Sequence, residues 1–478
     1  MKLSLLSVAL MLLFSLSISA QTVWETKSTI DALTGNNPYT IASGLIDNDT
    51  DLDILIGTDA DHIIVWYKGN GDGTFVKQTA ITNSLTNIVG IKLVDLDSDT
   101  DLDILAVGFG SYAAGYGTPS ALVWFQNDGS GNFGSEQLIT NAFDGMSGLF
   151  AGTIDAGSTI DVAVTSVVDG EVFWLSNDGS GNFSVPTNSS IDNTLNAPGV
   201  INMKDIDGDG DLDAVVATAN YSSDAIEIFR NDLVPGGTVL FTKDAASVTT
   251  GKIGIFNANF EDLDGDSNLD ILATEVSCGT CSPSTGNLYW YEDNGSGFTE
   301  TVFTTSINNP AVAQFKDVDN DGLNDIILSS GTAGAGNDLV WFKNNGSGSF
   351  GSETVIDDTQ SQAFVYTIND FDDDGDNDIA SCAYNQDDLN YFENLLESLN
   401  VDDIELIDFR IYPNPTTELL YFEGLNVSEI DVTITDILGK TIAIKAHNPS
   451  FPLNVSKLAK GLYTLKINDE FVTKFIKN

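Results

Sequence analysis

An acidic nine-residue segment recurs seven times along this chain of 478 residues. Its last residue is always aspartate, and successive copies are 50, 58, 52, 57, 55 and 53 residues apart. These aspartates are Asp53, Asp103, Asp161, Asp213, Asp270, Asp325 and Asp378. Such a regular period indicates like units that stack on one another, because a single unit of this size cannot bury its own apolar faces. We therefore expect one repeat architecture over most of the chain.

The copy DIDGDGDLD, from Asp205 to Asp213, shows the chemistry of the segment most fully. Aspartates occupy loop positions one, three, five, seven and nine, and Gly210 occupies position six. Oxygen ligands that alternate along a tight turn, with glycine where the chain bends, are typical of Ca²⁺ sites. The twelfth position, which carries a glutamate in an EF-hand, is Val216 here, and the run AVVAT after Asp213 is typical of a buried strand. The pattern predicts calcium loops between two strands, not EF-hands.

Five copies carry a complete ligand pattern, with side chains at positions one, three, five and nine and a backbone carbonyl at position seven. The predicted ligand sets are Asp95, Asp97, Asp99, Asp101 and Asp103; Asp205, Asp207, Asp209, Asp211 and Asp213; Asp262, Asp264, Asp266, Asn268 and Asp270; Asp317, Asp319, Asp321, Leu323 and Asp325; and Asp370, Asp372, Asp374, Asp376 and Asp378. The first copy predicts a weak sixth site, formed by Asp47, Asp49 and Asp53. The third copy retains only Asp155 and Asp161 and is expected to bind no ion.

Each unit contains four strand-like segments. One enters the acidic loop, a short apolar one leaves it, an aromatic-rich one such as LVWFQN follows, and a turn such as NDGSGNF leads into the fourth. Four strands in each of seven units predict an all-β fold, a seven-bladed β-propeller over residues 21–395. The aromatic rows recur in every unit, which favours packing between blades over a binding strip. The seventh unit lacks its fourth strand, and we expect Trp24–Ile30 to supply it and so remove an open sheet edge.

The two ends of the chain differ from the repeats. Residues 1–20 combine one lysine, a long apolar run and the small residue Ala20, which indicates a secretory signal peptide. No later stretch is long and apolar enough to span a membrane. Residues 396–408 are an acidic linker, and residues 409–478 have alternating short strands with Pro and Gly between them, which predict a small β-sandwich.

The charge of the chain excludes some partners. Residues 21–408 contain 63 acidic and 10 basic side chains, whereas the tail from Phe409 onward contains 7 and 8. Nucleic acids and anionic membrane surfaces require basic patches, so neither is expected as a partner. An apolar content of 42% is too high for a disordered acidic chain.

The three cysteines predict no metal centre. Cys278 and Cys281 form a single CxxC, and a zinc site would require a second pair. In an exported protein a small loop disulfide is the favoured state of this pair. Cys382 lies in an apolar strand and is expected in the core.

The acidic loops and the aromatic strands that follow them resemble the FG-GAP/VCBS repeats of calcium-binding propellers, over about residues 22–395. The tail resembles the type A C-terminal sorting domain of the type IX secretion system of Bacteroidota. Its matching residues are Tyr412-Pro413-Asn414-Pro415, the segment ITDILGK, Leu458–Tyr463 and the basic end with Lys474 and Lys477. This resemblance implies export through the periplasm and across the outer membrane, removal of the tail, and release or attachment of the propeller at the cell surface.

The residues favour binding over catalysis. Only His62 and His447 could serve a histidine-dependent mechanism, and the second lies in the tail. The loops opposite the calcium loops vary most in length, and variable loops on a rigid scaffold often carry function. We expect an adhesion or binding module for glycan or protein ligands, with Tyr112, Tyr116 and Tyr221 in contact with the ligand. The alternative is a polysaccharide lyase or glycoside hydrolase on a propeller scaffold, since paired carboxylates are available for such chemistry.

Overall fold

The structure is a computed structural model of the chain. It describes residues 24–47, 49–111, 119–220, 224–234, 236–276, 286–295, 297–303, 305–307, 309–331, 337–395, 410–423, 430–437, 440–467 and 471–478. Two compact units divide between Ser398 and Leu399. All regular elements in these ranges are β-strands. Within the same ranges, no helix has the length and apolar character needed to cross a membrane.

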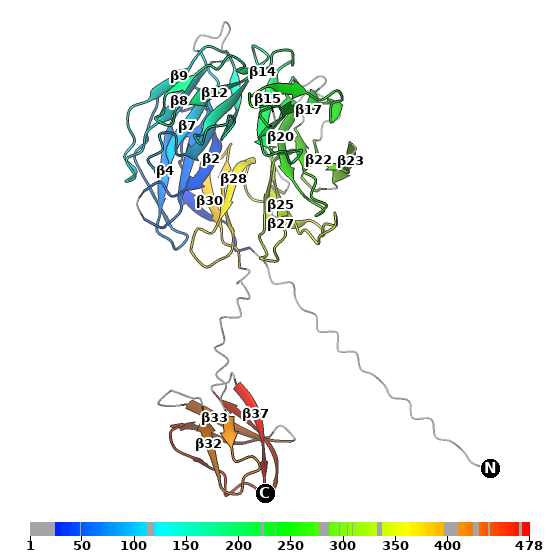
Figure 1. Cartoon of the computed structure of the whole chain (residues 1–478). Coiled ribbons are helices and arrows are strands. Elements are labelled where there is room, and N and C mark those ends of the chain that lie inside the picture. The colour runs from blue at the N-terminus through cyan, green and yellow to red at the C-terminus, as the bar shows by residue number, and fades with distance from the viewer. Residues whose placement is uncertain are drawn as a thin grey trace, which may run out of the picture. The chain divides into compact units, whose positions relative to one another are not determined.

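Seven antiparallel sheets form the first unit, and we number them as blades 1 to 7 (Figure 1). Blade 1 contains β2 (Pro38–Gly44), β3 (Asp53–Thr58), β4 (Ile64–Gly69) and β5 (Phe75–Lys77). Blade 2 contains β6 (Ile88–Val94), β7 (Asp103–Gly108), β8 (Ala121–Phe125) and β9 (Gln137–Thr140). Blade 3 contains β10 (Met146–Gly152), β11 (Asp161–Ser166), β12 (Glu171–Asn177), β13 (Phe183–Ser184) and β14 (Ser190–Asp192).

The remaining blades repeat this order. Blade 4 contains β15 (Pro198–Lys204), β16 (Asp213–Thr218), β17 (Asp224–Asn231), β18 (Phe241–Lys243) and β19 (Thr249–Lys252). Blade 5 contains β20 (Ile255–Glu261), β21 (Asp270–Glu275), β22 (Asn287–Asp293) and β23 (Phe298–Phe303). Blade 6 contains β24 (Pro310–Lys316), β25 (Asp325–Ser330), β26 (Leu339–Phe342) and β27 (Thr354–Asp357). Blade 7 contains β28 (Ala363–Asn369), β29 (Asp378–Ala383), β30 (Asp388–Phe392) and β1 (Ser28–Asp31). In blades 3 and 4 two short segments together form the outer strand, since both pair with the third strand.

Blade 7 closes the ring, as the sequence predicted. Strand β1 pairs antiparallel with β30, with Ser28 opposite Tyr391, and an isolated bridge joins Trp24 to Asn394. The N-terminal segment therefore completes the last blade of the propeller. Closure pairs an edge that would otherwise expose its N–H and C=O groups.

The core lies between adjacent blades. The second strand of each blade is buried along its whole length, because its apolar run lies between two neighbouring sheets. Trp66 of β4 packs with Ile104 and Phe125 of blade 2. The prediction that the aromatic rows pack between blades is confirmed.

Glycines in the outer turns allow this packing. A Cβ atom at Gly131 of blade 2 would lie 2.6 Å from the ring of Trp66 in blade 1, and φ at Gly131 is +72°. Across the closing boundary, a Cβ atom at Gly73 of blade 1 would lie 2.9 Å from the ring of Tyr391 in blade 7. Glycine is required at both positions by the close approach and by the positive φ.

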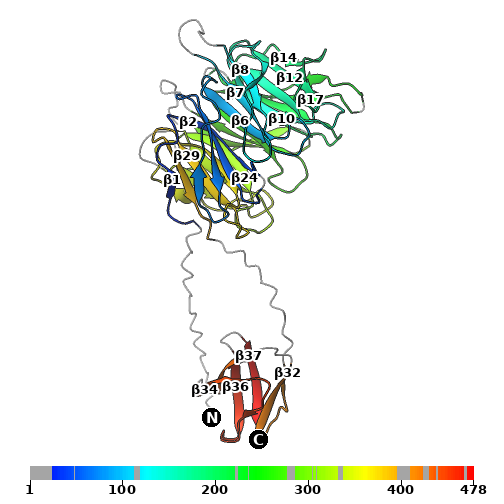
Figure 2. The ribbon, with the colours of Figure 1, turned by 90° about the vertical axis from the view of Figure 1, so that its left-hand side faces the viewer.

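The second unit is a small two-sheet structure, as the alternating pattern of the tail predicted (Figure 2). One sheet contains β31 (Arg410–Tyr412), β32 (Leu419–Glu423) and β35 (Leu453–Asn454). The other contains β34 (Thr441–His447), β33 (Ile430–Asp436), β36 (Gly461–Ile467) and β37 (Phe471–Lys477). Its buried core includes Leu420 from the first sheet and Val432, Leu465 and Phe475 from the second.

Candidate metal centres

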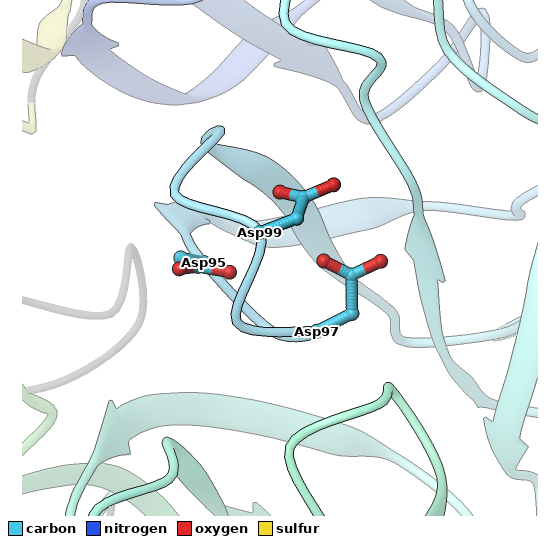
Figure 3. Close-up of side chains that lie close together, drawn as sticks. All are labelled: Asp95, Asp97 and Asp99. Carbon is cyan, nitrogen blue, oxygen red and sulfur yellow. The ribbon is translucent and has the colours of Figure 1, made fainter.

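Five acidic loops bring three carboxylates together at the turn between the first and second strands of a blade. In blade 2 the three come from Asp95, Asp97 and Asp99, on the turn between β6 and β7 (Figure 3). In each cluster, one oxygen from each residue lies within 4.8 Å of the other two. The other clusters are Asp205, Asp207 and Asp213; Asp262, Asp264 and Asp266; Asp317, Asp319 and Asp325; and Asp370, Asp372 and Asp374. These are the five loops that the sequence pattern marked as complete, and each could hold a metal ion.

The carboxylate at position one organises the loop. In blade 4 the N–H groups of Gly208 and Asp209 donate to Asp205 Oδ1 (2.8 and 3.1 Å), and the N–H of Gly210 donates to Asp205 Oδ2 (3.0 Å). Gly208 and Gly210 have φ values of +78° and +100°. Residues with positive φ at positions four and six therefore turn the backbone N–H groups toward position one.

Two loops make the same turn without glycine at position six. Thr100 has φ +80° and Ser267 has φ +76°. Their N–H groups still donate to the position-one carboxylates of Asp95 and Asp262 (both 3.0 Å). A β-branched residue in this region is strained by about 1–3 kcal/mol, so the hydrogen bonds of the loop hold Thr100 in a costly conformation.

The aspartate at position nine has a role in every blade, including blade 3, where the ligand pattern is incomplete. Asp161 is buried; its Oδ2 accepts the N–H of Ile154 (3.1 Å) and its Oδ1 accepts the N–H of Asn177 (2.9 Å). In blade 1 the N–H groups of Ile46 and Gly69 donate to Asp53 in the same way (3.0 and 2.9 Å). The position-nine carboxylate thus joins the acidic loop to the end of the third strand.

Burial also changes the acidity of these position-nine side chains. Desolvation raises the pKa of Asp53 and Asp378 to about 7, although backbone N–H groups partly oppose the shift. The structure brings two position-nine side chains, Asp213 and Asp325, into the three-carboxylate clusters. Ligation of an ion by the other position-nine residues stays a prediction.

Several buried carboxylate oxygens in these loops have no hydrogen-bond partner. They are Asp97 Oδ1, Asp211 Oδ1, Asp319 Oδ1 and both oxygens of Asp376. Asp376 is 1% exposed, and burial together with the neighbouring loop carboxylates raises its pKa to about 8. A buried carboxylate without a partner is strongly disfavoured. These loops have more carboxylate oxygens than N–H groups to bind them. The extra oxygens are the hard ligands that a divalent cation such as Ca²⁺ prefers.

The two incomplete loops are occupied by protein groups. In blade 1 the Lys68 ammonium pairs with Asp47 and with Asp49, at 2.6 Å from the latter. In blade 3 the Ser176 hydroxyl donates to Asp155 Oδ2 (3.1 Å). Among the described residues of these two loops, no cluster of three carboxylates forms.

The sequence reasoning missed one position that contacts the loops. It is the residue directly after the aromatic run of the third strand, and its chemistry differs from blade to blade. The observed contacts are Lys68 with Asp47 and Asp49, Gln126 with Asp97, Ser176 with Asp155, Arg230 with Asp213, and Lys343 with Asp319 and Asp321. The equivalent residues of blades 5 and 7 are Glu292 and Glu393. Alignment of the seven third strands on their aromatic residues would have revealed this position.

Other predicted site residues lie outside the described residues. They are the three tyrosines Tyr112, Tyr116 and Tyr221 and the pair Cys278 and Cys281. Cys382 lies in β29 as a buried free cysteine, as expected for a core residue.

Comparisons with known proteins identify both parts of the chain. The family described as "Secretion system C-terminal sorting domain" matches residues 410–478. The family described as "FG-GAP-like repeat" matches residues 46–106, 205–273 and 262–328. A search of curated proteins found no match. A solved structure of a variant of the Aleuria aurantia lectin AAL in complex with Fucalpha1-6GlcNAc is similar with a TM-score of 0.36 and 13% identity, covering 57% of this chain and 81% of that chain.

These matches agree with the resemblance found in the motifs. The sorting domain at the C-terminus indicates secretion or an outer-surface location through the type IX system, and it implies an interaction with that secretion machinery. The chain is a secreted propeller protein built from FG-GAP-like repeats and carrying a type IX secretion C-terminal sorting domain.

Proposed function

We propose that this protein is a calcium-stabilised propeller that binds a glycan or protein ligand outside the cell. The observation that carries the calcium assignment is the set of five three-carboxylate clusters, together with the buried carboxylate oxygens that lack a partner. When bound, Ca²⁺ supplies the positive charge at each turn, and the carboxylate and carbonyl oxygens of the loop coordinate it. The side chains at positions one and three hold it in all five blades, together with position five in blades 2, 5 and 7 and with position nine in blades 4 and 6.

The role of the ions is structural. Carboxylates within 4.8 Å of one another repel, and the propeller carries a large excess of acidic side chains. A cation that binds the folded loops and not the unfolded chain adds its binding free energy to folding. The position-nine carboxylate accepts hydrogen bonds from both the loop and the end of the third strand, so an ordered loop also fixes the position of that strand.

The residue after the aromatic run tunes each site. The ammonium groups of Lys68 and Lys343 compete with an ion for the loop carboxylates, and the Arg230 guanidinium does so more weakly because it contacts only position nine. Glu292 and Glu393 add negative charge instead. We therefore expect blades 5 and 7 to bind Ca²⁺ most tightly, blade 2 to follow, and blade 6 to be the weakest of the five.

Chelation tests the calcium assignment. Thermal melting in calcium and in excess EDTA should show a large loss of stability, since each site contributes about 4 kcal/mol at a thousandfold excess of ion over Kd. Elemental analysis should find about five ions per chain, one for each cluster. Asp97→Asn should remove one ion, while the matched change Asp155→Asn in blade 3 should remove none. An unchanged melting temperature in EDTA contradicts the assignment.

We infer the binding face from where the ions are expected to lie. The calcium loops and the turns between third and fourth strands share one face. In blade 2, for example, a Cβ atom at Gly129 of such a turn would lie 2.4 Å from Asp101 Oδ2 of the acidic loop. The sequences that connect second to third strands belong to the opposite face and vary in length, as in the segments 110–120 and 277–287. We assign ligand binding to that face, with Tyr112, Tyr116 and Tyr221 as contact residues.

Arrays of glycans and of surface proteins test this assignment. The mature protein should give saturable binding, and replacement of the three tyrosines by alanine should weaken it at unchanged melting temperature. Incubation with plant and algal polysaccharides should release no reducing ends and no unsaturated products. Release of such products supports the polysaccharide-degrading alternative, and saturable binding that is unchanged in the triple variant refutes the tyrosine assignment.

A further inference from the structure

A central cavity of about 1020 Å³ runs between the first strands of the seven blades. The fifth residue of each first strand forms one ring around it, and six of these seven residues line the cavity. The ring consists of Ala42, Lys92, Phe150, Asn202, Asn259, Gln314 and Thr367. A cavity of this volume is in the range of small-molecule sites.

Blades 4 to 7 contribute a polar half to this ring. The Asn202 amide donates to Asn259 Oδ1 (2.6 Å), and the Asn259 amide donates to Asn257 Oδ1 (3.1 Å). The Gln314 amide donates to the carbonyl oxygen of Tyr366 (2.8 Å). All three residues line the cavity, and the carbonyl oxygens of Asn202 and Gln314 and the amide group of Asn257 have no described hydrogen-bond partner. The polar half therefore offers two hydrogen-bond acceptors and one donor group, and such amide groups can bind the hydroxyl groups of a ligand.

The other half of the ring holds a single cation. Seven of the ten basic residues of the propeller form ion pairs, and Lys316 donates to Asn369 Oδ1 (3.5 Å). Lys92 lines the cavity and has no hydrogen-bond or ion-pair partner among the described residues. Its side chain is exposed in the cavity, and the protein that surrounds the cavity lowers its pKa by desolvation. In a chain with 63 acidic residues before the tail, an ammonium kept away from every carboxylate is free to meet an anion from outside.

A cluster of aromatic rings lies at the edge of the cavity on the side of the variable loops, and two of them, Tyr39 and Phe256, line it. Tyr39, Phe256 and Phe364 are each the second residue of the first strand in their blade. The ring centroid of Phe364 lies 4.9 Å from that of Tyr39 and 4.8 Å from that of Phe256. Tyr384 completes the group at 5.7 Å from Phe364. Tyr39, Phe256 and Tyr384 remain partly exposed. Partly exposed rings offer an apolar face for the C–H groups of a sugar, with a polar group at the tyrosine hydroxyl.

We propose that the central cavity binds a saccharide that carries a carboxylate, such as a terminal uronic acid, with the carboxylate on Lys92. The carbonyl oxygens of Asn202 and Gln314 and the amide of Asn257 bind its hydroxyl groups, and the aromatic rings cover its apolar face. This inference rests on the proposed binding function and names the ligand class. Its residues are distinct from the three tyrosines of the variable loops, so the two assignments can fail separately.

Calorimetric titration of the calcium-loaded mature protein tests the inference. The probes are D-glucuronate and D-galacturonate, with D-glucose, D-galactose and acetate as comparison ligands. We expect saturable binding of at least one uronate, at least about tenfold tighter than its neutral sugar and than acetate, because a charge-assisted hydrogen bond contributes about 1.5–3 kcal/mol. Lys92→Gln should weaken uronate binding about tenfold, while Lys92→Arg should retain most of it.

The matched control is Lys316→Gln, which removes a cation that already has a partner and should leave uronate binding unchanged. Melting temperatures of all variants in calcium establish that they are folded. Uronate binding that survives Lys92→Gln, or equal binding of acetate and uronate, overturns the cavity assignment. If arrays show saturable glycan binding while neither uronate binds, the cavity assignment fails and the binding function stands; if nothing binds on arrays or in titration, both fail.

Discussion

The amide of Asn127 joins two blades, and its removal is the sharpest test of how the ring is held together. Asn127 follows the third strand of blade 2 and is 1% exposed. Its Nδ2 donates to the carbonyl oxygen of Ile46 in blade 1 (2.7 Å) and to that of Leu102 in its own blade (3.1 Å). The same pattern links Asn177, Asn344 and Asn394 to the preceding blades.

We expect Asn127→Ala to lower the free energy of unfolding by about 3–5 kcal/mol. Two hydrogen bonds contribute about 1 kcal/mol each, and a buried carbonyl oxygen left without its donor costs a further 1–3 kcal/mol. The backbone N–H of residue 127 still donates to Asp103 Oδ1, so the loop contact is kept. The loss thus reports the amide and not the acidic loop.

Asn231 is the matched control because it occupies the same position in blade 4. Its Nδ2 is buried without a partner, and its Oδ1 accepts only the N–H of Leu240 (3.2 Å). Asn231→Ala should therefore cost no more than about 1 kcal/mol. Urea unfolding of both variants, followed by tryptophan fluorescence at saturating calcium, measures the difference. Equal midpoints for the two variants would refute the reasoning that inter-blade amides stabilise the ring.

Two further predictions follow from charges in the structure. Lys343→Gln should tighten calcium binding in blade 6, because it removes the ammonium 2.9 Å from Asp321; direct titration should show one site shifted to lower Kd, and no shift would contradict competition. Asp338 lies outside the acidic loops, is 1% exposed, and has its pKa raised to about 7 by burial and by Asp357 and Asp358. Because its folded pKa exceeds the unfolded value of about 3.9, its ionisation destabilises the fold increasingly between pH 4 and 7 and fully above pH 7. Asp338→Asn should thus be more stable than wild type by about 1–3 kcal/mol at pH 8, with the gain disappearing near pH 4 in calcium-saturated melts; a gain independent of pH would contradict this cause.

Much of the fold could be predicted because it is local and repeated. The alternation of apolar and turn residues defines each strand within a few residues, and seven copies in register make the pattern unambiguous. Even the long-range pairing of β1 with β30 was predictable, since Trp24–Ile30 carries the fourth-strand pattern that the last unit lacks. The five complete loops were likewise visible, because each cluster draws its ligands from one nine-residue segment.

Contacts between units were decided only by the tertiary structure. An alignment of the third strands points to the position of Lys68 and Lys343 but not to its partner, since the third strand and the acidic loop meet only when the strands pair. The isolation of Lys92 depends on which side chains six other blades place around one cavity. The sequence by itself determined the repeating unit and its clusters of carboxylates, because both are properties of short segments. Strand pairing and ring closure decided which side chains surround each acidic loop and the central cavity, because they bring together residues that are far apart in the sequence.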